Sequence, residues 1–490
     1  MDQKQRPQVE VPTTPRVLIF PLPAQGHVTS MLTLAELLSL CGIDVTFLNT
    51  DHVHNRLFRH ADIEARFADY PGLLFRTISD GLPDDHPRSN DRSITEVLHS
   101  MIATTKPVLN EMLVSGALGS VTCIIADGAF AGFVTNSACE LHVPIIYYQP
   151  ASACCLWTLL CFDDIIKAGE LPIRGKEDMD RIITSVPGMK SFLRCRDLPS
   201  FCQVNDTSAT KINPVARAIR QSCSAQGIIL NTFEELEGPI ISHIIRSFCP
   251  NTYTIGPLHA HLKHKLAKKN VSKSDQSSNS IFEVDRKCMD WLDSQPPKSV
   301  IYVSFGSITT LTRDALLEFW HGLVNSNVRF LWVVRPDMLT GECAGEVPSE
   351  LLEATRERGY MVRWAPQEEV LSHRAVGGFL THSGWNSTLE SIVAGVPMIC
   401  WPYFADQQIN SRFVGEVWKL GIDMKDVCDR KIVEKMVIDL TVERREEFLK
   451  STAKMARLAG ESVCEGGLSD SNFDRLVEYI RLTAKEKSAR

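Results

Sequence analysis

The chain has 490 residues, of which 44% are apolar and 23% are charged, and this composition excludes wholesale disorder. Its net charge of −7 argues against a general nucleic-acid binder and against electrostatic docking on anionic membranes. The sequence contains no run of about 18 apolar residues, so no membrane span is predicted.

The start of the chain is polar, and the apolar run Val17–Phe20 is too short for a signal-peptide core. The 15 cysteines are an odd number and form no C-x-x-C pair. This favours reduced, buried thiols over zinc sites or a disulfide framework. We therefore expect a cytoplasmic protein without integral membrane contact. We also expect a monomer.

Short β-rich apolar runs alternate with helical patterns through the first half of the chain. Continuous apolar strands separated by helices, such as those expected at Ser30–Cys41 and Gly132–Leu141, are typical of a parallel sheet covered on both faces. The predicted strands are RVLIF from Arg16, DVTFLNT from Asp44, TCIIAD from Thr122, VPIIYY from Val143 and GIILNT from Gly227.

Two polar side chains lie at the carboxyl ends of these strands, where open α/β sheets bind ligands. His27 follows the first strand after Gly26, and Asp127 ends TCIIAD. A carboxylate can orient an imidazole and stabilise its charged form, and such a histidine can deprotonate a hydroxyl. Although a lone loop histidine is usually structural, the pair predicts a catalytic base with an acidic partner.

A Lys- and Ser-rich stretch from His259 to Ser280 shows no apolar period, and we interpret it as an exposed linker at residues 259–283. It separates a first domain, residues 1–258, from a second, residues 284–470. Its three histidines lack the carboxylate or Cys support of a metal site. The D-x-D pattern at Asp178 lies in a charged loop and is interpreted as surface.

The strand pattern restarts after the linker. These runs predict a second doubly wound α/β domain, with a cleft between the two domains. The second set of strands is SVIYVSFGS from Ser299, VRFLWVV from Val328, YMVRW from Tyr360, GGFLTH from Gly377 and VPMICWP from Val396.

The densest signal in the sequence is a strand, a glycine turn and a helix. GGFLTH ends near His382, and a helix beginning at Asn386 or Ser387 matches a capping box closed by Glu390. Such a turn points free N–H groups and a positive dipole end into the cleft, which suits a diphosphate. Alternatively, these side chains only cap the helix.

Further polar groups follow neighbouring strands of the second set. Trp364 follows the YMVR strand, where its ring could stack on a base. Ser307 lies in a glycine turn that could approach phosphate closely. The pair Asp406–Gln407 emerges at the same edge and suits a ligand with many hydroxyls.

From Arg16 onward the chain resembles plant family-1 UDP-dependent glycosyltransferases. The resemblance implies the GT-B fold, in which two Rossmann-like domains face each other and a last helix, here residues 471–490, packs back on the first domain. The matching landmarks of the family's signature box are W-A-P-Q at Trp364, H-S-G-W-N-S at His382, E-S at Glu390, G-V-P at Gly395, W-P at Trp401 and D-Q at Asp406.

The resemblance also implies a role for each residue of the box. Trp364 would stack on uracil, Ala365 and Gln367 would meet the base edge, and Glu390 would hold the ribose. Four residues would bind the diphosphate: Ser307, His382, Asn386 and Ser387. Three would hold sugar hydroxyls: Trp385, Asp406 and Gln407.

The implied reaction is an inverting transfer of glucose from UDP-glucose. His27 would deprotonate the acceptor with Asp127 as its partner, and Gln407 goes with glucose donors more often than with galactose donors in the family. No metal or other cofactor is expected, because helix dipole and side-chain donors offset the charge of the leaving group.

The acceptor pocket is expected from three loops of the first domain: Phe75–Pro83, Ser152–Phe162 and Ile183–Phe201. Relatives often carry a sugar-contacting Thr where this chain has Pro150, and Ser152 is the candidate substitute. We expect a hydroxyl or carboxyl of a small hydrophobic plant metabolite. Similarity to enzymes that act on terpenoids, including iridoids, favours that class, while flavonoid and phenolic acceptors stay open.

Other classes of protein fit less well. No G-x-G-x-x-G follows either first strand, as a dehydrogenase would require, and there is no Walker A motif. A UDP-sugar epimerase or a non-catalytic UDP-sugar sensor shares the architecture and remains an alternative, although a sensor would not need His27.

Overall fold

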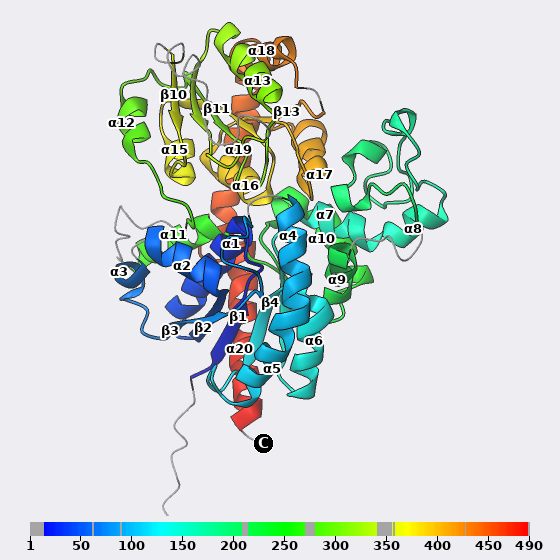
Figure 1. Cartoon of the computed structure of the whole chain (residues 1–490), viewed down its shortest axis with the longest axis vertical. Coiled ribbons are helices and arrows are strands. Elements are labelled where there is room, and N and C mark those ends of the chain that lie inside the picture. Colours follow the sequence, from blue (N-terminus) through cyan, green and yellow to red (C-terminus); the bar gives the residue numbers. More distant parts are fainter. Residues whose placement is uncertain are drawn as a thin grey trace, which may run out of the picture.

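Two parallel β-sheets with helices on both faces form the two lobes of the computed structural model (Figure 1). The structure describes residues 14–488 except 61–62, 89–90, 208–213, 270–279, 341–354, 356–357 and 427. Within this part of the chain, no helix combines the length and apolar character that crossing a bilayer requires.

The first domain is built on a seven-stranded sheet in the order β3-β2-β1-β4-β5-β6-β7. Val17 pairs with Val45 on one side and with Cys123 on the other, so the strand order reverses between β1 and β4. The strands are β1 Arg16–Phe20, β2 Asp44–Thr50, β3 Leu73–Ile78, β4 Cys123–Asp127, β5 Ile145–Gln149, β6 Gly227–Leu230 and β7 Thr252–Thr254.

The second domain is built on a six-stranded sheet in the order β10-β9-β8-β11-β12-β13. Tyr302 pairs with Leu331 and with Phe379, so the order reverses between β8 and β11. The strands are β8 Val300–Ser304, β9 Arg329–Val333, β10 Gly359–Val362, β11 Val376–Thr381, β12 Met398–Cys400 and β13 Gly421–Asp423.

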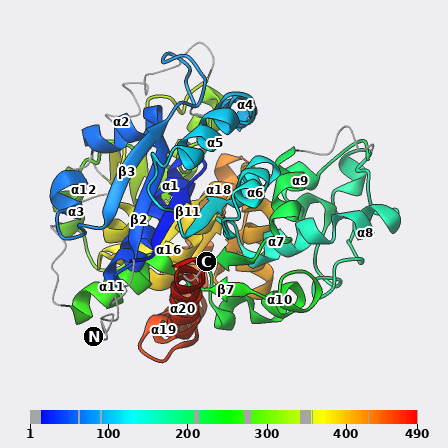
Figure 2. The same cartoon turned by 90° about the horizontal axis from the view of Figure 1, so that it is seen from below.

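Helices connect successive strands and cover both sheets (Figure 2). Those of the first domain are α1 Gln25–Leu40, α2 Asp51–His60, α3 Ile63–Phe67, α4 Asp91–Ser100, α5 Lys106–Val114, α6 Ala131–Glu140, α7 Ala153–Leu160, α8 Phe162–Lys167, α9 Pro214–Ser222, α10 Glu234–Ser247 and α11 Leu258–Lys268. Those that follow are α12 Lys287–Asp293, α13 Arg313–Asn325, α15 Gln367–Ser372, α16 Trp385–Ala394, α17 Gln407–Arg412, α18 Arg430–Ile438, α19 Arg445–Val463 and α20 Leu468–Ser488.

Each sheet buries apolar side chains on both of its faces. In β1, Leu18 and Phe20 belong to one core cluster, whereas Val17 and Ile19 belong to the other. This is why the predicted strands are continuous apolar runs and do not alternate.

The last helix returns to the first domain. After α19, helix α20 runs along the first lobe and contacts β7 (Figures 1 and 2). Its residues Phe473, Leu476, Val477 and Ile480 have helical spacing and join the core cluster of Val17 and Ile19. Helix α20 begins at Leu468, slightly before the expected residue 471.

The structure corrects the interpretation of the linker. Part of the stretch expected to be an exposed linker is helix α11, whose residues Leu258, Leu262 and Leu266 are buried in the first domain's core. Their spacing of four is an apolar period that the histidines and lysines between them obscure. His261 is also buried, with its Nδ1 3.1 Å from the Ile255 carbonyl. Residues 270–279 lie outside the described residues.

Three strands were not predicted, and each is an edge strand or only three residues long: β3, β7 and β13. The expected acceptor loop Phe75–Pro83 therefore begins inside strand β3.

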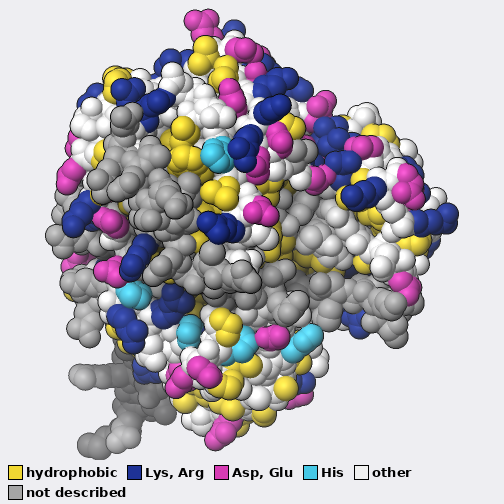
Figure 3. Space-filling view, turned by 45° about the horizontal axis from the view of Figure 1, so that its top comes forward, with side chains coloured by type: hydrophobic (Ala, Val, Ile, Leu, Met, Phe, Trp, Pro, Cys, Tyr) yellow, Lys and Arg dark blue, Asp and Glu magenta, His cyan; other side chains and the backbone are white. Residues whose placement is uncertain are grey.

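On the face of the molecule shown in Figure 3, basic and acidic side chains of the described residues lie interspersed.

Candidate active site

A cavity of about 990 Å³ lies between the two domains at the carboxyl ends of both sheets. His27 and Asp127 follow β1 and β4, which flank the point where the first sheet reverses its order. Ser307 and His382 follow β8 and β11, which flank the point where the second sheet reverses its strand order. All the catalytic and donor-site residues predicted from the sequence line this cavity. Such a switch point is where open α/β sheets bind ligands.

His27 and Asp127 form a hydrogen-bonded pair. His27 Nδ1 lies 2.6 Å from Asp127 Oδ2, and since a carboxylate only accepts, Nδ1 carries the proton. Asp127 is fully buried, and its other oxygen accepts the Ala129 N–H at 3.0 Å. The carboxylate is thus fixed by the backbone that follows β4, and it fixes the imidazole in turn.

Two carboxylates act on the His27 ring. Burial alone lowers its pKa, but the charge and hydrogen bond of Asp127 and the charge of Asp406 outweigh burial and raise it above 6.5. Asp406 comes from the second domain, and burial raises its pKa to about 6 against the opposing effects of Asn410 and His27. The two domains therefore place a base and a second acid on opposite sides of one cavity.

The first turn of α16 has no side-chain cap, so the predicted capping box is wrong. The helix begins at Trp385 with Gly384 as its N-cap residue, and Ser387 and Glu390 lie inside the helix. The first backbone N–H groups of α16 have no intrahelical partner and open toward the cavity. The predicted end at Gly395 is confirmed, since this residue has a left-handed φ of 65°.

His382 is wedged between two glycine turns. A Cβ on Gly306 or Gly384 would lie 2.4 or 2.5 Å from His382 Nε2, so both turns require glycine. Burial and the nearby Arg335 guanidinium lower the pKa of His382 to about 4. His382 is therefore a neutral imidazole beside Ser307 and the start of α16.

The residues expected at the nucleoside are joined to each other. Gln367 Nε2 donates to Ser387 Oγ at 2.8 Å and to Glu390 Oε2 at 2.6 Å. Burial raises the pKa of Glu390, with a further rise from the charge of Glu368. Trp364 stacks on Phe282 with ring centroids 4.4 Å apart, and Ala365 is buried beside it.

Three further donor-site residues already have hydrogen-bond partners, two of them in the first domain. The Trp385 indole N–H donates to the Asn231 carbonyl at 2.8 Å, so only the backbone of Trp385 can donate into the cavity. The Asn386 amide donates to the Gly26 carbonyl at 2.7 Å, directly before His27. Gln407 Oε1 accepts the N–H groups of Tyr403 and Phe404, which leaves its Nε2 as the donor group.

Ser152 does not replace the expected threonine at the sugar. It is fully buried at the N-terminus of α7, where its Oγ accepts from the Cys155 N–H and donates to Asn410 Oδ1 at 2.7 Å. Asn410 in turn donates to Asp406 Oδ2 at 2.7 Å. Sequence reasoning missed Asn410, although its position four residues after Asp406 predicts such a contact on a helix.

The remaining wall of the cavity is largely apolar. Of the three expected loops, Ser152–Phe162 contributes Leu156 and Leu159, Ile183–Phe201 contributes Ser200 and Phe201, and Phe75–Pro83 contributes no described lining residue. Helix α4 was missed and supplies Ile94 and Leu98. Trp157 points away from the cavity, since its indole N–H donates to the Pro187 carbonyl at 2.9 Å.

Comparisons with known proteins agree with this geometry. The family described as UDP-glucoronosyl and UDP-glucosyl transferase matches residues 247–436. The chain is 56% identical to 7-deoxyloganetic acid glucosyltransferase of Catharanthus roseus over 96% of this chain and 98% of that protein. It is 43% identical to the myricetin 3-O-rhamnoside 1,2-glucosyltransferase of Crocosmia x crocosmiiflora, over 95% of each chain.

Among solved structures, Os79 from O. sativa in complex with UDP superposes with a TM-score of 0.77 at 27% identity, covering 95% of this chain and 100% of that one. The fold is thus GT-B, as the sequence predicted, and the protein is a nucleotide-sugar-dependent transferase. The chain belongs to the UDP-glucuronosyl and UDP-glucosyl transferase family.

Proposed function

We propose that this enzyme transfers glucose from UDP-glucose, with inversion, to a small hydrophobic plant metabolite of the terpenoid class. The observation that carries the proposal is the His27–Asp127 pair, which faces Asp406 and Gln407 across a cavity that ends at the uncapped start of α16. A base, sugar-binding groups and a phosphate-binding helix terminus are thereby brought together.

In the proposed mechanism, His27 Nε2 takes the proton of an acceptor hydroxyl while Nδ1–H stays on Asp127. The acceptor oxygen attacks the anomeric carbon from the face opposite the diphosphate. The new C–O bond forms as the bond to the UDP oxygen breaks, so an α-linked donor gives a β-glucoside. Asp127 stabilises the imidazolium that forms.

The donor residues keep their proposed roles. Trp364, Ala365 and Gln367 bind the uracil, and Glu390 binds the ribose, whose hydroxyls can donate to its carboxyl oxygens. Asp406, the Gln407 amide and the backbone of Trp385 hold the sugar.

The diphosphate would be bound by Ser307, His382, Asn386, Ser387 and the first N–H groups of α16. These neutral donors and the helix dipole can stabilise the charge that develops on UDP, so the proposed reaction uses no metal and no further cofactor.

The acceptor class is supported by the apolar wall and by the relatives. Leu98, Leu156 and Phe201 offer contact area without many polar groups, which suits a terpenoid skeleton. The relative at 56% identity is named for 7-deoxyloganetic acid. A flavonoid glycoside is the second candidate, since the relative at 43% identity is named for myricetin 3-O-rhamnoside. A non-catalytic sensor would leave the His27–Asp127 pair without a purpose.

The proposal includes a cytoplasmic, monomeric enzyme. The cysteines of the described residues are free and most are buried, and such thiols suit a reducing compartment. A fluorescent fusion and a sedimentation mass check these two points.

The test is a screen of UDP-glucose against terpenoid, flavonoid and phenolic acceptors, read by mass. Wild-type enzyme is expected to form a monoglucoside, preferentially of a terpenoid. His27→Ala should lower kcat by roughly 10²–10⁴-fold and leave UDP affinity unchanged, because only the base is removed. Unchanged turnover in His27→Ala would refute the role of His27, and turnover of UDP-glucose to another UDP-sugar without acceptor would favour an epimerase.

A further inference from the structure

A loop of the first domain rests on the second domain behind the acceptor wall. It is defined here as residues 192–203, the bridging loop. The Arg412 guanidinium at the end of α17 donates twice to the Phe192 carbonyl, at 3.0 and 3.1 Å. Ile409 and Phe413 join the core cluster of the first domain, which contains Leu198 of the loop. Helix α17 therefore packs on the first domain as well as on its own.

Asp197 is the centre of this contact. Its side chain is fully buried and accepts the backbone N–H of Arg194 at 2.8 Å and the Arg194 guanidinium at 2.9 and 3.0 Å. Lys425 Nζ from the second domain lies 2.6 Å away, and Arg412 Nε lies 3.5 Å away. Burial raises the pKa of Asp197, but Arg194 and Lys425 outweigh burial and hold the pKa below its usual range. The buried charge therefore depends on cations from both domains.

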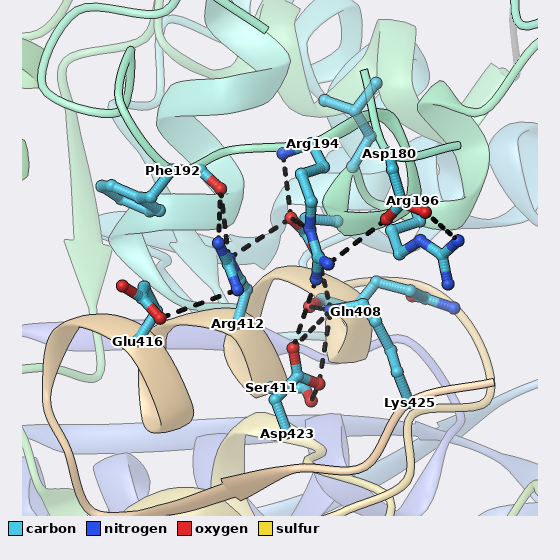
Figure 4. A network of polar contacts seen from close by, with 12 residues as sticks. Asp180, Phe192, Arg194, Arg196, Gln408, Ser411, Arg412, Glu416, Asp423 and Lys425 are labelled. Carbon is cyan, nitrogen blue, oxygen red and sulfur yellow. Dashed lines mark hydrogen bonds and ion pairs between the residues drawn. The ribbon is translucent and has the colours of Figure 1, made fainter. Parts of the chain in front are cut away.

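Lys425 connects this ion cluster around Asp197 to α17, the helix that begins at Gln407. Its ammonium is almost fully buried and contacts Asp197, Asp423 at 3.1 Å and the Gln408 carbonyl at 3.2 Å. Gln408 directly follows Gln407. Figure 4 shows Arg194 and Arg196 entering from the bridging loop, with Arg412, Asp423 and Lys425 on the opposite side.

The other end of the bridging loop reaches the cavity. Ser200 N–H donates to the Ala405 carbonyl at 2.9 Å, and the Ala405 N–H donates back to Ser200 Oγ at 2.8 Å. Ser200 and Phe201 line the acceptor side of the cavity, and Phe404 to Gln407 line the sugar side. The acceptor wall Ser200–Phe201 and the sugar-binding segment Phe404–Gln407 are therefore held together. The ion cluster around Asp197 and Lys425 lies behind them.

We propose that Asp197 and Lys425 are positioning residues. They hold the acceptor wall Ser200–Phe201 against the sugar-binding segment Phe404–Gln407, so that the acceptor oxygen lies in line for attack on the anomeric carbon. The inference rests on the proposed function of the cavity. A displacement of about 1 Å at such a point can lower a rate by about 100-fold. The nucleoside-binding residues Trp364 and Glu390 lie wholly in the second domain and do not depend on the cluster.

The test compares Lys425→Met with the wild type and with Asp426→Asn. Lys425→Met should lower kcat/KM for the acceptor by about 10- to 100-fold and raise the share of UDP-glucose that is hydrolysed without glucoside formation. UDP affinity, measured by calorimetry, should stay within about twofold. Asp426 is the matched control, since it also pairs across the domains, with Arg196 at 2.5 Å, but at the exposed rim, where ion pairs contribute little.

Arg412→Lys serves as the second variant in case Lys425→Met does not fold. It keeps the positive charge but loses the double contact with the Phe192 carbonyl, and it should shift the same ratio of hydrolysis to transfer in the same direction. Unchanged acceptor KM, kcat and hydrolysis in folded Lys425→Met or Arg412→Lys, whatever their melting temperature, would overturn the inference. So would an equal loss of UDP affinity. A wild type that glucosylates no acceptor would instead refute the proposed function.

Discussion

His27 gains its chemical character from two carboxylates that belong to different domains. Asp127 fixes the proton on Nδ1, which makes Nε2 the proton acceptor of the proposed mechanism. Asp406 faces the same ring from the sugar side of the cavity and adds to the rise of the histidine pKa. A base whose pKa lies near the working pH transfers protons efficiently in both directions.

The first prediction concerns the acid limb of the pH profile. His27 acts as a base only when neutral, and its pKa is raised above 6.5, so kcat/KM should fall on acidification from a pH above 6.5. In Asp127→Asn, the negative charge that raises the pKa of His27 is lost, while burial still lowers that pKa. The limb should therefore move below pH 6.5, and the maximal rate should fall because the ring loses its orientation. Initial rates from pH 5 to 9 measure both, and an unmoved limb would assign it to another group.

Much of this site could be predicted at the level of single residues, because parallel strands end at one edge. That geometry predicted that His27, Asp127 and Asp406 lie at the edge where the cavity is found. Ala365 and Gln367, which also line the cavity, were expected only from the resemblance to the family. The partners of Ser152 and Trp385 could not be predicted, since Asn410 and Asn231 lie more than 150 residues away in the sequence. Nothing in the local pattern reveals that these two side chains are already engaged.

At the scale of elements, the turn between β11 and α16 determines the geometry of the proposed diphosphate site. Gly384 lets the chain pass over His382 and leaves the first N–H groups of α16 without a side-chain cap. The sequence predicted the strand, turn and helix, but it also predicted a capping box. The spacing of Ser387 and Glu390 fits either a capping box or a pair of ligand-binding side chains. The helix start at Trp385 excludes the capping box, because it places both residues inside the helix.

Gly384→Ala is expected to weaken UDP binding by at least tenfold with the fold retained, because its Cβ would lie 2.5 Å from His382 Nε2 and displace the imidazole. The matched control is Gly460→Ala in α19, where a Cβ meets nothing within 4 Å. That change should leave UDP binding intact and stabilise the fold by about 0.5–1 kcal/mol. Calorimetry and thermal unfolding read both variants, and equal UDP affinity in the two would contradict the role of the turn.

The predictions for elements succeeded where burial is uniform and failed at edges. Central strands such as β1 and β4 are continuous apolar runs because both of their faces are covered. Strand β3 lies at the edge of the sheet and mixes buried and exposed side chains. In α11, three leucines alternate with histidines and lysines. Both were interpreted as loop or linker for that reason.

At the scale of the whole molecule, the two domains meet through specific polar contacts as well as across the cavity. Asn386 reaches Gly26, Trp418 Nε1 donates to the Leu236 carbonyl at 3.1 Å, and Asp197 binds Lys425. In the proposed mechanism the donor lies mainly in one domain and the base in the other, so these contacts would set the distance over which the transfer takes place. Domain docking of this kind follows from the folded surfaces and has no signature in the sequence pattern.

The most direct test of the account is the anomeric configuration of the product, read by proton NMR on the glucoside formed from UDP-α-glucose. Attack by an acceptor activated at His27, on the face opposite a diphosphate bound at α16, predicts a β-glucoside only. An α-glucoside would contradict the single displacement across this cavity.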